Sequence, residues 1–183
     1  SQAIAKVAPR TWGDKMVLYP NLFCKDVTEI TIEILRKNNI KGLILDVDNT
    51  LIDYHRNLDQ KIKKWVDNLK KENIKFCIVS NSNNHEKVKK VSEELDIPYF
   101  YFAKKPFKRG FLKAKNKMNL NEKNVAAVGD QIMTDVIGAN RCNMFSILVE
   151  PINEKDIFIT KVKRPIERCI MNRYFKKMQK EKE

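Results

Sequence analysis

The sequence predicts an α/β protein of three layers (α/β/α), with helices covering both faces of a mainly parallel β-sheet. Short apolar segments alternate along the chain with longer segments whose apolar residues recur at helical spacing. This alternation is typical of parallel strands joined by crossover helices. The apolar segments also lack the polar alternation of half-buried strands, which indicates that the sheet is buried on both faces.

The first half of the chain predicts elements in the order helix, strand, helix, strand, helix, at 27–38, 41–47, 58–73, 74–80 and 84–95. The two strands are apolar runs. The clearest helix is the second, because Ile62, Trp65, Val66 and Leu69 fall on one stripe.

The second half predicts elements in the order strand, helix, strand, helix, strand, helix, at 99–103, 107–118, 125–128, 132–142, 145–149 and 165–182. Pro98 precedes the first of these strands, which is aromatic, and Pro151 stops the last. Asn143 can provide a left-handed cap after the helix 132–142. Pro165 is expected to start the basic C-terminal helix.

The size and composition of the chain fit one globular domain. It has 183 residues, of which 43% are hydrophobic and 32% charged, enough to bury a core. No internal repeat or linker divides it. We expect residues 16–183 to form a single domain, and residues 1–15 to be a non-native or loosely attached extension.

The cysteines and the apolar runs bear on the compartment. Cys24, Cys77, Cys142 and Cys169 lie far apart without metal-site spacing, so we expect reduced thiols, not zinc or disulfides. No apolar run reaches the roughly 18 residues of a membrane span, and no secretion signal is recognisable. The cytoplasm or an organelle matrix is expected, with peripheral contact on the inner face of a membrane as a further option.

Lysine and arginine outnumber aspartate and glutamate by 36 to 23, which gives a net charge of +13. Such a balance favours anionic partners: phosphate compounds, nucleic acid or an anionic membrane. A lysine-rich composition with a solvated surface explains the charge equally well.

Polar residues follow four of the predicted strands. In a parallel sheet the ligand site lies beyond the carboxyl ends of the strands. The candidates there, in chain order, are Asp46, Asp48, Asn49, Thr50, Ser80, Asn81, Lys105, Asp130 and Asp135. Each alone has an ordinary interpretation as a turn residue, a helix cap or an exposed lysine. Their order on successive strands favours a shared site.

This set suits phosphoryl transfer. Asp46 and Asp48 are two residues apart, so on an extended segment their side chains face the same way. One carboxylate can attack phosphorus and form an aspartyl-phosphate, and the other can transfer protons. A Mg²⁺ ion held by Asp46 and Asp130 would remove the repulsion between the carboxylates and an anionic phosphate.

The remaining candidates can bind the phosphate itself. Lys105 supplies a positive charge, and the Ser80 hydroxyl and the Asn81 backbone N–H can hold phosphate oxygens near a helix start. His55 and His85 are isolated, and we expect no catalytic role for either.

The segments DVDNTL, VSN, KKP and GDQIMTD resemble motifs I to IV of the haloacid dehalogenase (HAD) superfamily of phosphatases, subfamily IIIA. LYPNLF, GDQIMTDVIGANR, ILVEPI and KVKRPIER resemble the bacterial YqeG family, which is similar to the mitochondrial and plastid phosphatases acting on phosphatidylglycerophosphate. The resemblance implies a Rossmann-like fold and Mg²⁺ dependence. Asn143 stands where we expect the family to favour glycine.

The resemblance also implies roles for four aspartates. Asp46 would be the nucleophile, and Asp48 the acid/base that also binds metal through its backbone carbonyl. Asp130 would bind the metal directly, and Asp135 directly or through water. Asn49 and Thr50 would support the first motif.

Cap domains are common in this superfamily, but the intervals between the motifs leave no room for one here. An open site suits phosphate on a large molecule. The resemblance implies phosphatidylglycerophosphate, dephosphorylated to phosphatidylglycerol at the membrane surface, and this is our first hypothesis. Nucleotides, nucleic-acid ends or phosphoprotein are alternative substrates. A further alternative is a nucleic-acid- or ribosome-binding module on the same fold.

Two apolar features bear on membrane contact. The C-terminal helix places Ile166, Ile170 and Tyr174 on one stripe among basic residues; core packing is slightly favoured over contact with an anionic membrane. Phe107 and Phe111 lie among basic residues and are expected in the core.

Overall fold

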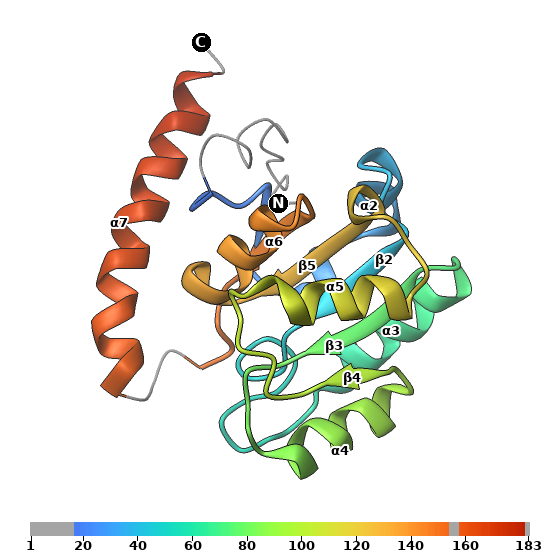
Figure 1. The fold of residues 1–183 in the computed structure, drawn as a ribbon. Helices are drawn as coiled ribbons and strands as arrows, with labels where there is room; N and C mark the ends of the chain where they lie inside the picture. Colours follow the sequence, from blue (N-terminus) through green and yellow to red (C-terminus); the bar gives the residue numbers. More distant parts are fainter. Residues whose placement is uncertain (1–16, 154–157, 182–183) are drawn as a thin grey trace.

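The computed structural model describes residues 17–153 and 158–181, so the segment 1–15, which we expect to be an extension, lies outside the described residues. Its sheet has the order β1-β6-β5-β2-β3-β4, with every pair parallel, which confirms the predicted fold class (Figure 1). The strands are β1 (Leu22–Cys24), β2 (Gly42–Leu45), β3 (Lys75–Val79), β4 (Tyr99–Phe100), β5 (Val125–Gly129) and β6 (Phe145–Val149).

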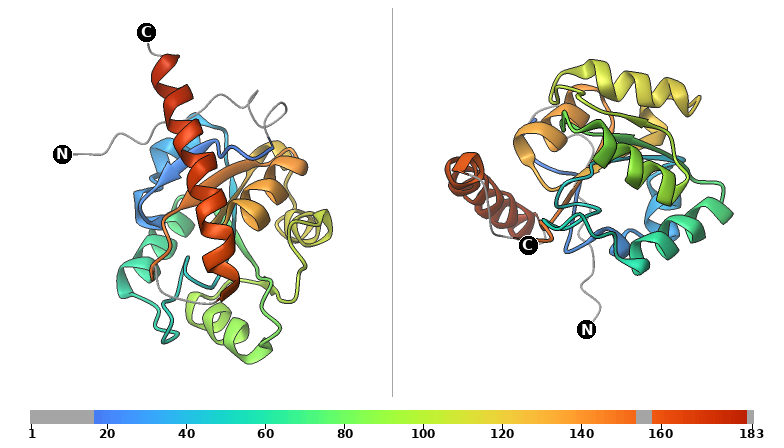
Figure 2. Two further views of the ribbon diagram at one scale, coloured as in Figure 1. Left: turned by 90° about the vertical axis from the view of Figure 1, so that its left-hand side faces the viewer. Right: turned by 90° about the horizontal axis from the view of Figure 1, so that it is seen from below.

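Helices cover both faces of the sheet. The α-helices are α2 (Ile32–Lys37), α3 (Gln60–Lys71), α4 (His85–Leu95), α5 (Lys108–Lys117), α6 (Ile137–Arg141) and α7 (Phe158–Lys180). Short turns of 3₁₀-helix, η1 (Val27–Glu29) and η2 (Glu122–Asn124), and of π-helix, η3 (Ile132–Val136), complete the set. Buried residues of α2, α3 and α4 pack on one face of the sheet, and those of α5 and α6 on the other (Figure 2).

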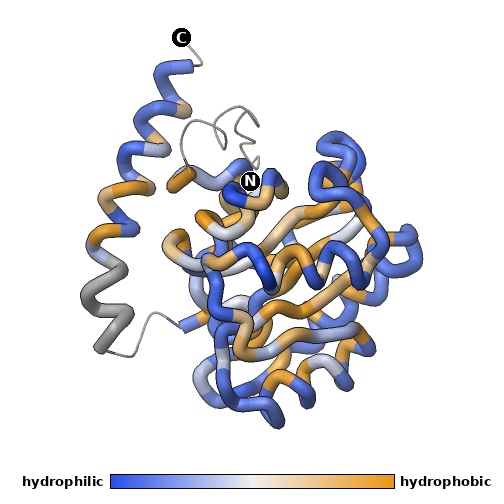
Figure 3. The backbone as a smooth tube through the Cα atoms, in the orientation of Figure 1, coloured by the Kyte–Doolittle hydropathy of each residue, from blue (hydrophilic) through white to orange (hydrophobic). Residues whose placement is uncertain are grey.

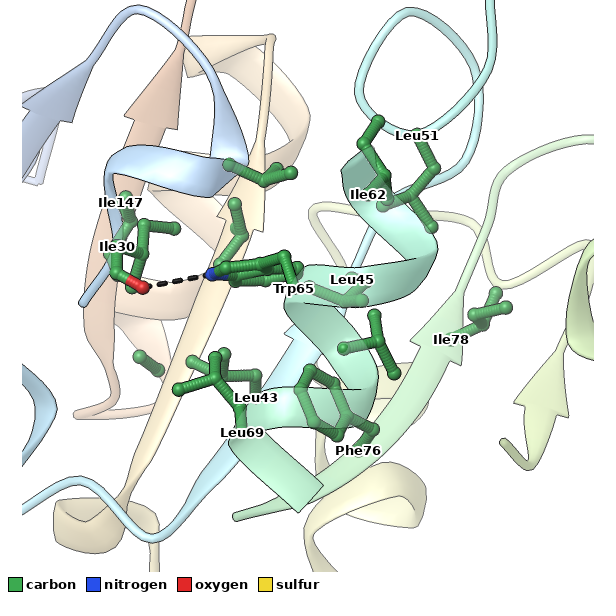
Figure 4. Packing of buried hydrophobic residues seen from close by; sticks show 14 of the residues in the cluster. Ile30, Leu43, Leu45, Leu51, Ile62, Trp65, Leu69, Phe76, Ile78 and Ile147 are labelled. Atoms are coloured by element: carbon green, nitrogen blue, oxygen red, sulfur yellow. Dashed lines mark hydrogen bonds between the residues drawn. The ribbon is translucent and has the colours of Figure 1, made fainter. Parts of the chain in front are cut away.

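The larger core lies between the sheet and α3 (Figure 4). The predicted stripe of α3 is buried there, and the indole Nε1 of Trp65 donates a hydrogen bond of 2.9 Å to the Ile30 carbonyl. The ring of Trp65 also meets that of Phe76 edge to face, with centroids 5.8 Å apart. Figure 3 shows the hydrophobic residues concentrated along the central strands, as burial on both faces requires.

The order of the strands places the site. From β2 the chain continues through β3 to β4 on one side, and it later returns to β5 and β6 on the other. The connections after β2 and β5 therefore diverge, and a crevice opens between their carboxyl ends. Asp46 and Asp130 follow these two strands directly, and the Asp46 N–H donates to the Val128 carbonyl at 3.0 Å.

Two predictions at the N-terminal end were incomplete. The strand β1 was not predicted, because three residues at a sheet edge are too few for a periodic signal. The helix predicted over 27–38 is interrupted at Ile30, because the side chains of both Asp26 and Thr31 accept from backbone N–H groups and start separate turns.

Two left-handed residues end the predicted strand 99–103 early, after Phe100. Phe102 has a φ of 50° and Lys104 a φ of 55°, so the chain turns there. The left-handed conformation predicted for Asn143 is confirmed, with a φ of 57°. The predicted helix 132–142 begins as η3 and continues as α6.

The C-terminal helix differs from its prediction at its start. It begins at Phe158, so Pro165 lies inside it and not at its first turn. An interior proline lacks an N–H donor and crowds the carbonyl four residues earlier, and the helix nevertheless continues past it to Lys180. Tyr174 and Met178 of α7 are buried against Tyr19 and Phe23, beside the β1 edge of the sheet. Core packing of this part of the stripe is therefore confirmed, whereas Ile166 is exposed.

Phe111 is buried as predicted, with 1% of its surface exposed, but Phe107 is 64% exposed. The prediction for Phe107 was wrong because this residue is the N-cap of α5 and precedes the helical face that packs on the sheet. The four cysteines are free in the structure, with Cys24, Cys77 and Cys142 buried and Cys169 exposed. Across 17–153 and 158–181, no helix is both long and apolar enough to cross a bilayer.

Candidate active site

Three buried carboxylates meet beyond the carboxyl ends of the central strands. Asp46 follows β2, Asp130 follows β5, and Asp135 lies in η3. Each offers a carboxylate oxygen, and these oxygens all lie within 4.8 Å of one another. Burying like charges together is costly unless cations balance them. The cluster is therefore built to hold positive charge.

Lys105 provides one such charge. Its Nζ lies 2.9 Å from Asp46 Oδ1 and 2.6 Å from Asp135 Oδ1, and only 3% of its side chain is exposed. Burial alone would lower the pKa of Lys105, but the carboxylates of Asp135 and Asp46 outweigh it and hold the pKa above its usual range. The lysine is therefore charged at neutral pH.

The pKa of the Asp135 carboxyl group is raised above its ordinary value. Burial raises its pKa to about 7, and the charge of Asp46 acts in the same direction, although Lys105 opposes both. The Gln131 N–H donates to Asp135 Oδ2 at 3.2 Å. A Cβ on Gly129 would lie 2.1 Å from Asp135 Cγ, so the glycine of the Gly-Asp pair leaves the space that this carboxylate occupies.

The carboxylate oxygens of Asp46, Asp130 and Asp135 are close enough together to hold a further cation. The donors of the cluster are all carboxylate oxygens, which hard divalent cations such as Mg²⁺, Mn²⁺ and Ca²⁺ prefer. Three ligands on two strand ends and one helical turn are consistent with such an ion. The residues present therefore fit the divalent metal expected from the sequence.

Asn81 holds the segment that carries Lys105. The Lys105 N–H donates to Asn81 Oδ1 at 2.6 Å, and Asn81 Nδ2 donates to the Lys105 carbonyl at 3.0 Å. From the sequence we expected only the backbone N–H of Asn81 to act, by binding phosphate. In the structure its side chain also forms these two hydrogen bonds with the Lys105 backbone, which we call the Asn81 clamp. Ser80 is fully buried directly after β3, and its Oγ accepts from the Ser82 N–H at 3.1 Å.

Asp48 lies outside the carboxylate cluster. Its Oδ1 is 2.7 Å from Nζ of Lys87 in α4, and 49% of its side chain is exposed. Lys87 was missed by sequence analysis, because nothing distinguishes it among the many lysines of the chain. Asn49 turns the chain with a φ of 59°, and the Thr50 hydroxyl donates to Asp130 Oδ1 at 3.3 Å.

A second residue that sequence analysis missed comes from α7. Glu167 is buried, and its Oε1 accepts from the N–H groups of Ile132 (3.0 Å) and Met133 (3.3 Å). These N–H groups open the turn that carries Asp135. A carboxylate there satisfies helix-terminal donors. The sequence pointed to this region only through the family-like segment KVKRPIER, which contains Glu167. That segment does not indicate which of its residues contacts the turn of Asp135.

We expect Glu167→Ala to destabilise the protein by about 2–3 kcal/mol, because it leaves two partly or fully buried N–H donors without this acceptor. For a chain of this size the melting temperature should fall by roughly 4–12 °C. Glu167→Gln keeps an acceptor oxygen and should cost less than half as much. Thermal melting of the two variants checks this, and equal melting temperatures for Glu167→Ala and wild type would contradict the cap.

Comparison with known proteins shows the family of the chain. The family model described as Mitochondrial PGP phosphatase matches residues 3–153. The chain is 41% identical over 159 residues, 86% of its length and 92% of the relative, to Probable phosphatase YqeG of Bacillus subtilis (strain 168). It is 25% identical over 176 residues, 90% of its length but only 50% of the relative, to Phosphatidylglycerophosphate phosphatase 1, chloroplastic/mitochondrial, of Arabidopsis thaliana.

Among solved structures, the cobalt-bound deoxy-D-mannose-octulosonate 8-phosphate phosphatase of Haemophilus influenzae has the same fold. The TM-score is 0.50 at 17% identity, over 68% of this chain and 75% of that one. The family model and the relatives show a phosphoric monoester hydrolase of the HAD class, and the fold agrees with that class. The chain belongs to the Mitochondrial PGP phosphatase family and is a HAD phosphatase of the YqeG type.

Proposed function

We propose that the protein is a Mg²⁺-dependent phosphatase that removes the terminal phosphate of phosphatidylglycerophosphate at a membrane surface, through an aspartyl-phosphate. The observation that carries the chemistry is the contact of Lys105 with Asp46 inside the carboxylate cluster. The name of the plant relative and that of the family support the substrate.

Asp46 is the proposed nucleophile. Its carboxylate attacks phosphorus, the bond between phosphorus and the ester oxygen breaks, and Asp48 delivers a proton to the leaving oxygen. Asp48 then removes a proton from water as that water attacks the aspartyl-phosphate, which restores Asp46 and releases inorganic phosphate. Lys105 orients Asp46 and places positive charge beside the incoming phosphate.

The proposed Mg²⁺ would be held by Asp46, Asp130 and Asp135, together with the Asp48 backbone carbonyl. The ion would neutralise phosphate charge during transfer. Ser80 and Asn81 would bind phosphate oxygens as the sequence predicts, with the Asn81 side chain also fixing Lys105. Lys87 would orient Asp48 from α4.

The open site supports a large substrate. Residues 46–80 hold a short loop, α3 and β3, and residues 80–105 hold α4 and β4, so neither interval contains a folded cap. A phosphate on a lipid headgroup can reach such a site without being enclosed. Because α7 uses Tyr174 and Met178 for packing, membrane contact through this helix would depend on its basic residues and the exposed Ile166.

A comparison of substrates tests this function. Initial rates are measured on phosphatidylglycerophosphate in mixed micelles, nucleotides, 5′-phosphorylated oligonucleotides and phosphopeptides, each with Mg²⁺ or with EDTA. We expect Mg²⁺-dependent hydrolysis that is at least about tenfold faster, in kcat/KM, on the lipid, which is about 1.4 kcal/mol of discrimination. Faster turnover of any other class would replace the lipid as substrate, and full activity in EDTA would exclude the metal.

A further inference from the structure

The connection from β4 to α5 forms a surface of unusual composition next to the candidate site. It is a shallow depression of about 550 Å³. We call it the β4–α5 surface, and its principal residues are Tyr101, Phe102, Lys104, Phe107, Arg109 and Lys113. It lies outside the phosphoryl-transfer site itself, and no step of the proposed reaction uses it.

Three aromatic residues of the β4–α5 surface are exposed. Tyr101 has 44%, Phe102 55% and Phe107 64% of its surface open to solvent. A single exposed aromatic residue is ordinary, but several in one patch mark an interaction site. Three exposed rings within seven residues indicate that this surface binds a partner with an apolar component.

The same segment is strongly basic. Residues 97–121 contain seven lysines and arginines and no aspartate or glutamate. Of the seven, only Lys105 is buried. A surface that combines unopposed positive charge with exposed rings is complementary to a partner that is both anionic and apolar.

The β4–α5 surface is continuous with the site through Lys105. Because Phe102 and Lys104 adopt left-handed φ angles, the chain turns sharply there. Lys105 is buried against Asp46, whereas its neighbour Lys104 and the nearby Phe107 remain exposed. The six residues from Phe102 to Phe107 therefore serve both the site and the surface.

The ring contacts favour a lipid interface over nucleic acid. Lys104 Nζ lies 5.2 Å from the ring centroid of Phe102, and Lys113 Nζ lies 5.8 Å from that of Phe100. The ring of His85 stacks on Tyr101, with centroids 4.5 Å apart. Stacking with bases needs free ring faces, and of the three exposed rings Tyr101 and Phe102 already have a face occupied. Insertion among lipid headgroups instead needs rings and cations side by side.

We propose that the β4–α5 surface docks the enzyme on an anionic phospholipid bilayer. The exposed rings enter the interfacial layer, the lysines and arginine contact lipid phosphates, and Lys105 is brought to the level of a headgroup phosphate. The inference rests on the proposed function, because it supplies the surface on which a phospholipid substrate would be reached.

Vesicle co-sedimentation of the full chain tests the proposal, with vesicles of phosphatidylglycerol and phosphatidylcholine or of phosphatidylcholine alone. Wild type should bind the anionic vesicles, and added salt should weaken the binding. Phe102→Ala/Phe107→Ala and Lys104→Gln/Lys113→Gln should each weaken it about tenfold or more. The ratio of turnover on vesicle-borne substrate to turnover on a soluble aryl phosphate should fall in both variants.

Matched controls come from other surfaces. Lys63→Gln/Lys64→Gln removes the same charge from α3, and Ile166→Ala removes an exposed apolar residue from α7; both should bind vesicles like wild type. Circular dichroism checks the fold of every variant. Hydrolysis of the soluble aryl phosphate by wild type measures phosphatase activity without any contribution from membrane docking.

Several results would overturn the docking surface. These are no binding of wild type to anionic vesicles, undiminished binding by both β4–α5 variants, or loss of binding in Ile166→Ala alone. Tight, salt-sensitive binding of fluorescein-labelled single-stranded RNA that is lost in the β4–α5 variants, while their vesicle binding persists, would assign the surface to nucleic acid. If the soluble substrate is not hydrolysed, the proposed function fails, and the vesicle results still decide whether the surface binds lipid.

Discussion

Asp46→Asn is expected to reduce turnover of a soluble aryl phosphate by about four orders of magnitude or more, because an amide cannot serve as the attacking nucleophile. Asn has nearly the same shape and leaves an oxygen that can accept from Lys105, and Asp135 still pairs with that lysine. The variant should therefore fold. Steady-state kinetics with Mg²⁺ measures the loss, and Asp67→Asn, the same change on the exposed side of α3, is the control.

Acid quenching during turnover of a phosphate-labelled substrate examines the same step directly. Wild type should retain label on the peptide that contains Asp46, and Asp46→Asn should retain none. Label on a different residue, or undiminished turnover in the variant, would show that another group attacks phosphorus. A folded variant without label or turnover would support the covalent route.

Lys105→Met is expected to have the second largest effect, on both stability and activity. It leaves Asp46 and Asp135 without their buried cation, and breaking such a pair costs about 3–5 kcal/mol. For a chain of this length the melting temperature in EDTA should fall by roughly 6–20 °C. Turnover should fall about a hundredfold or more, since a charge aimed at the phosphate is lost.

Added Mg²⁺ should distinguish the effect of Lys105→Met on stability from its effect on turnover. Mg²⁺ bound to the carboxylates should restore part of the lost stability, because it replaces one buried positive charge by another, but it should not restore turnover. Differential scanning fluorimetry with and without Mg²⁺ measures this, with Lys64→Met on the exposed side of α3 as the control, expected within about 0.5 kcal/mol of wild type. If Lys105→Met and wild type had the same melting temperature in EDTA, the ion pairs of Lys105 with Asp46 and Asp135 would not stabilise the fold.

Local patterns were sufficient for the sheet and for the positions of the candidate residues along it. Apolar runs without polar alternation predicted five of the strands, and the stripe of α3 predicted its buried face. Because parallel strands bring their carboxyl ends to one edge, the residues after each strand could be assigned to one region before any contact was known. This is why Asp46, Lys105, Asp130 and Asp135 could be grouped in advance.

The same patterns could not specify contacts between distant side chains. Glu167 reaches Ile132 across 35 residues and Lys87 reaches Asp48 across 39. Contacts between residues so far apart in the sequence produce no periodic pattern. In addition, Glu167 and Lys87 are each one charged residue among many in this chain.

The pattern of apolar residues along the chain was thus enough to predict the class of sheet and which polar residues end its strands, because strand burial leaves a local apolar signal. Three features became known only from the folded chain: Phe107 is exposed, the Asn81 side chain holds the Lys105 backbone, and α7 supports the turn of Asp135. These features depend on how the turns orient individual side chains and on how separate elements pack, and neither is set by the spacing of residues along the chain.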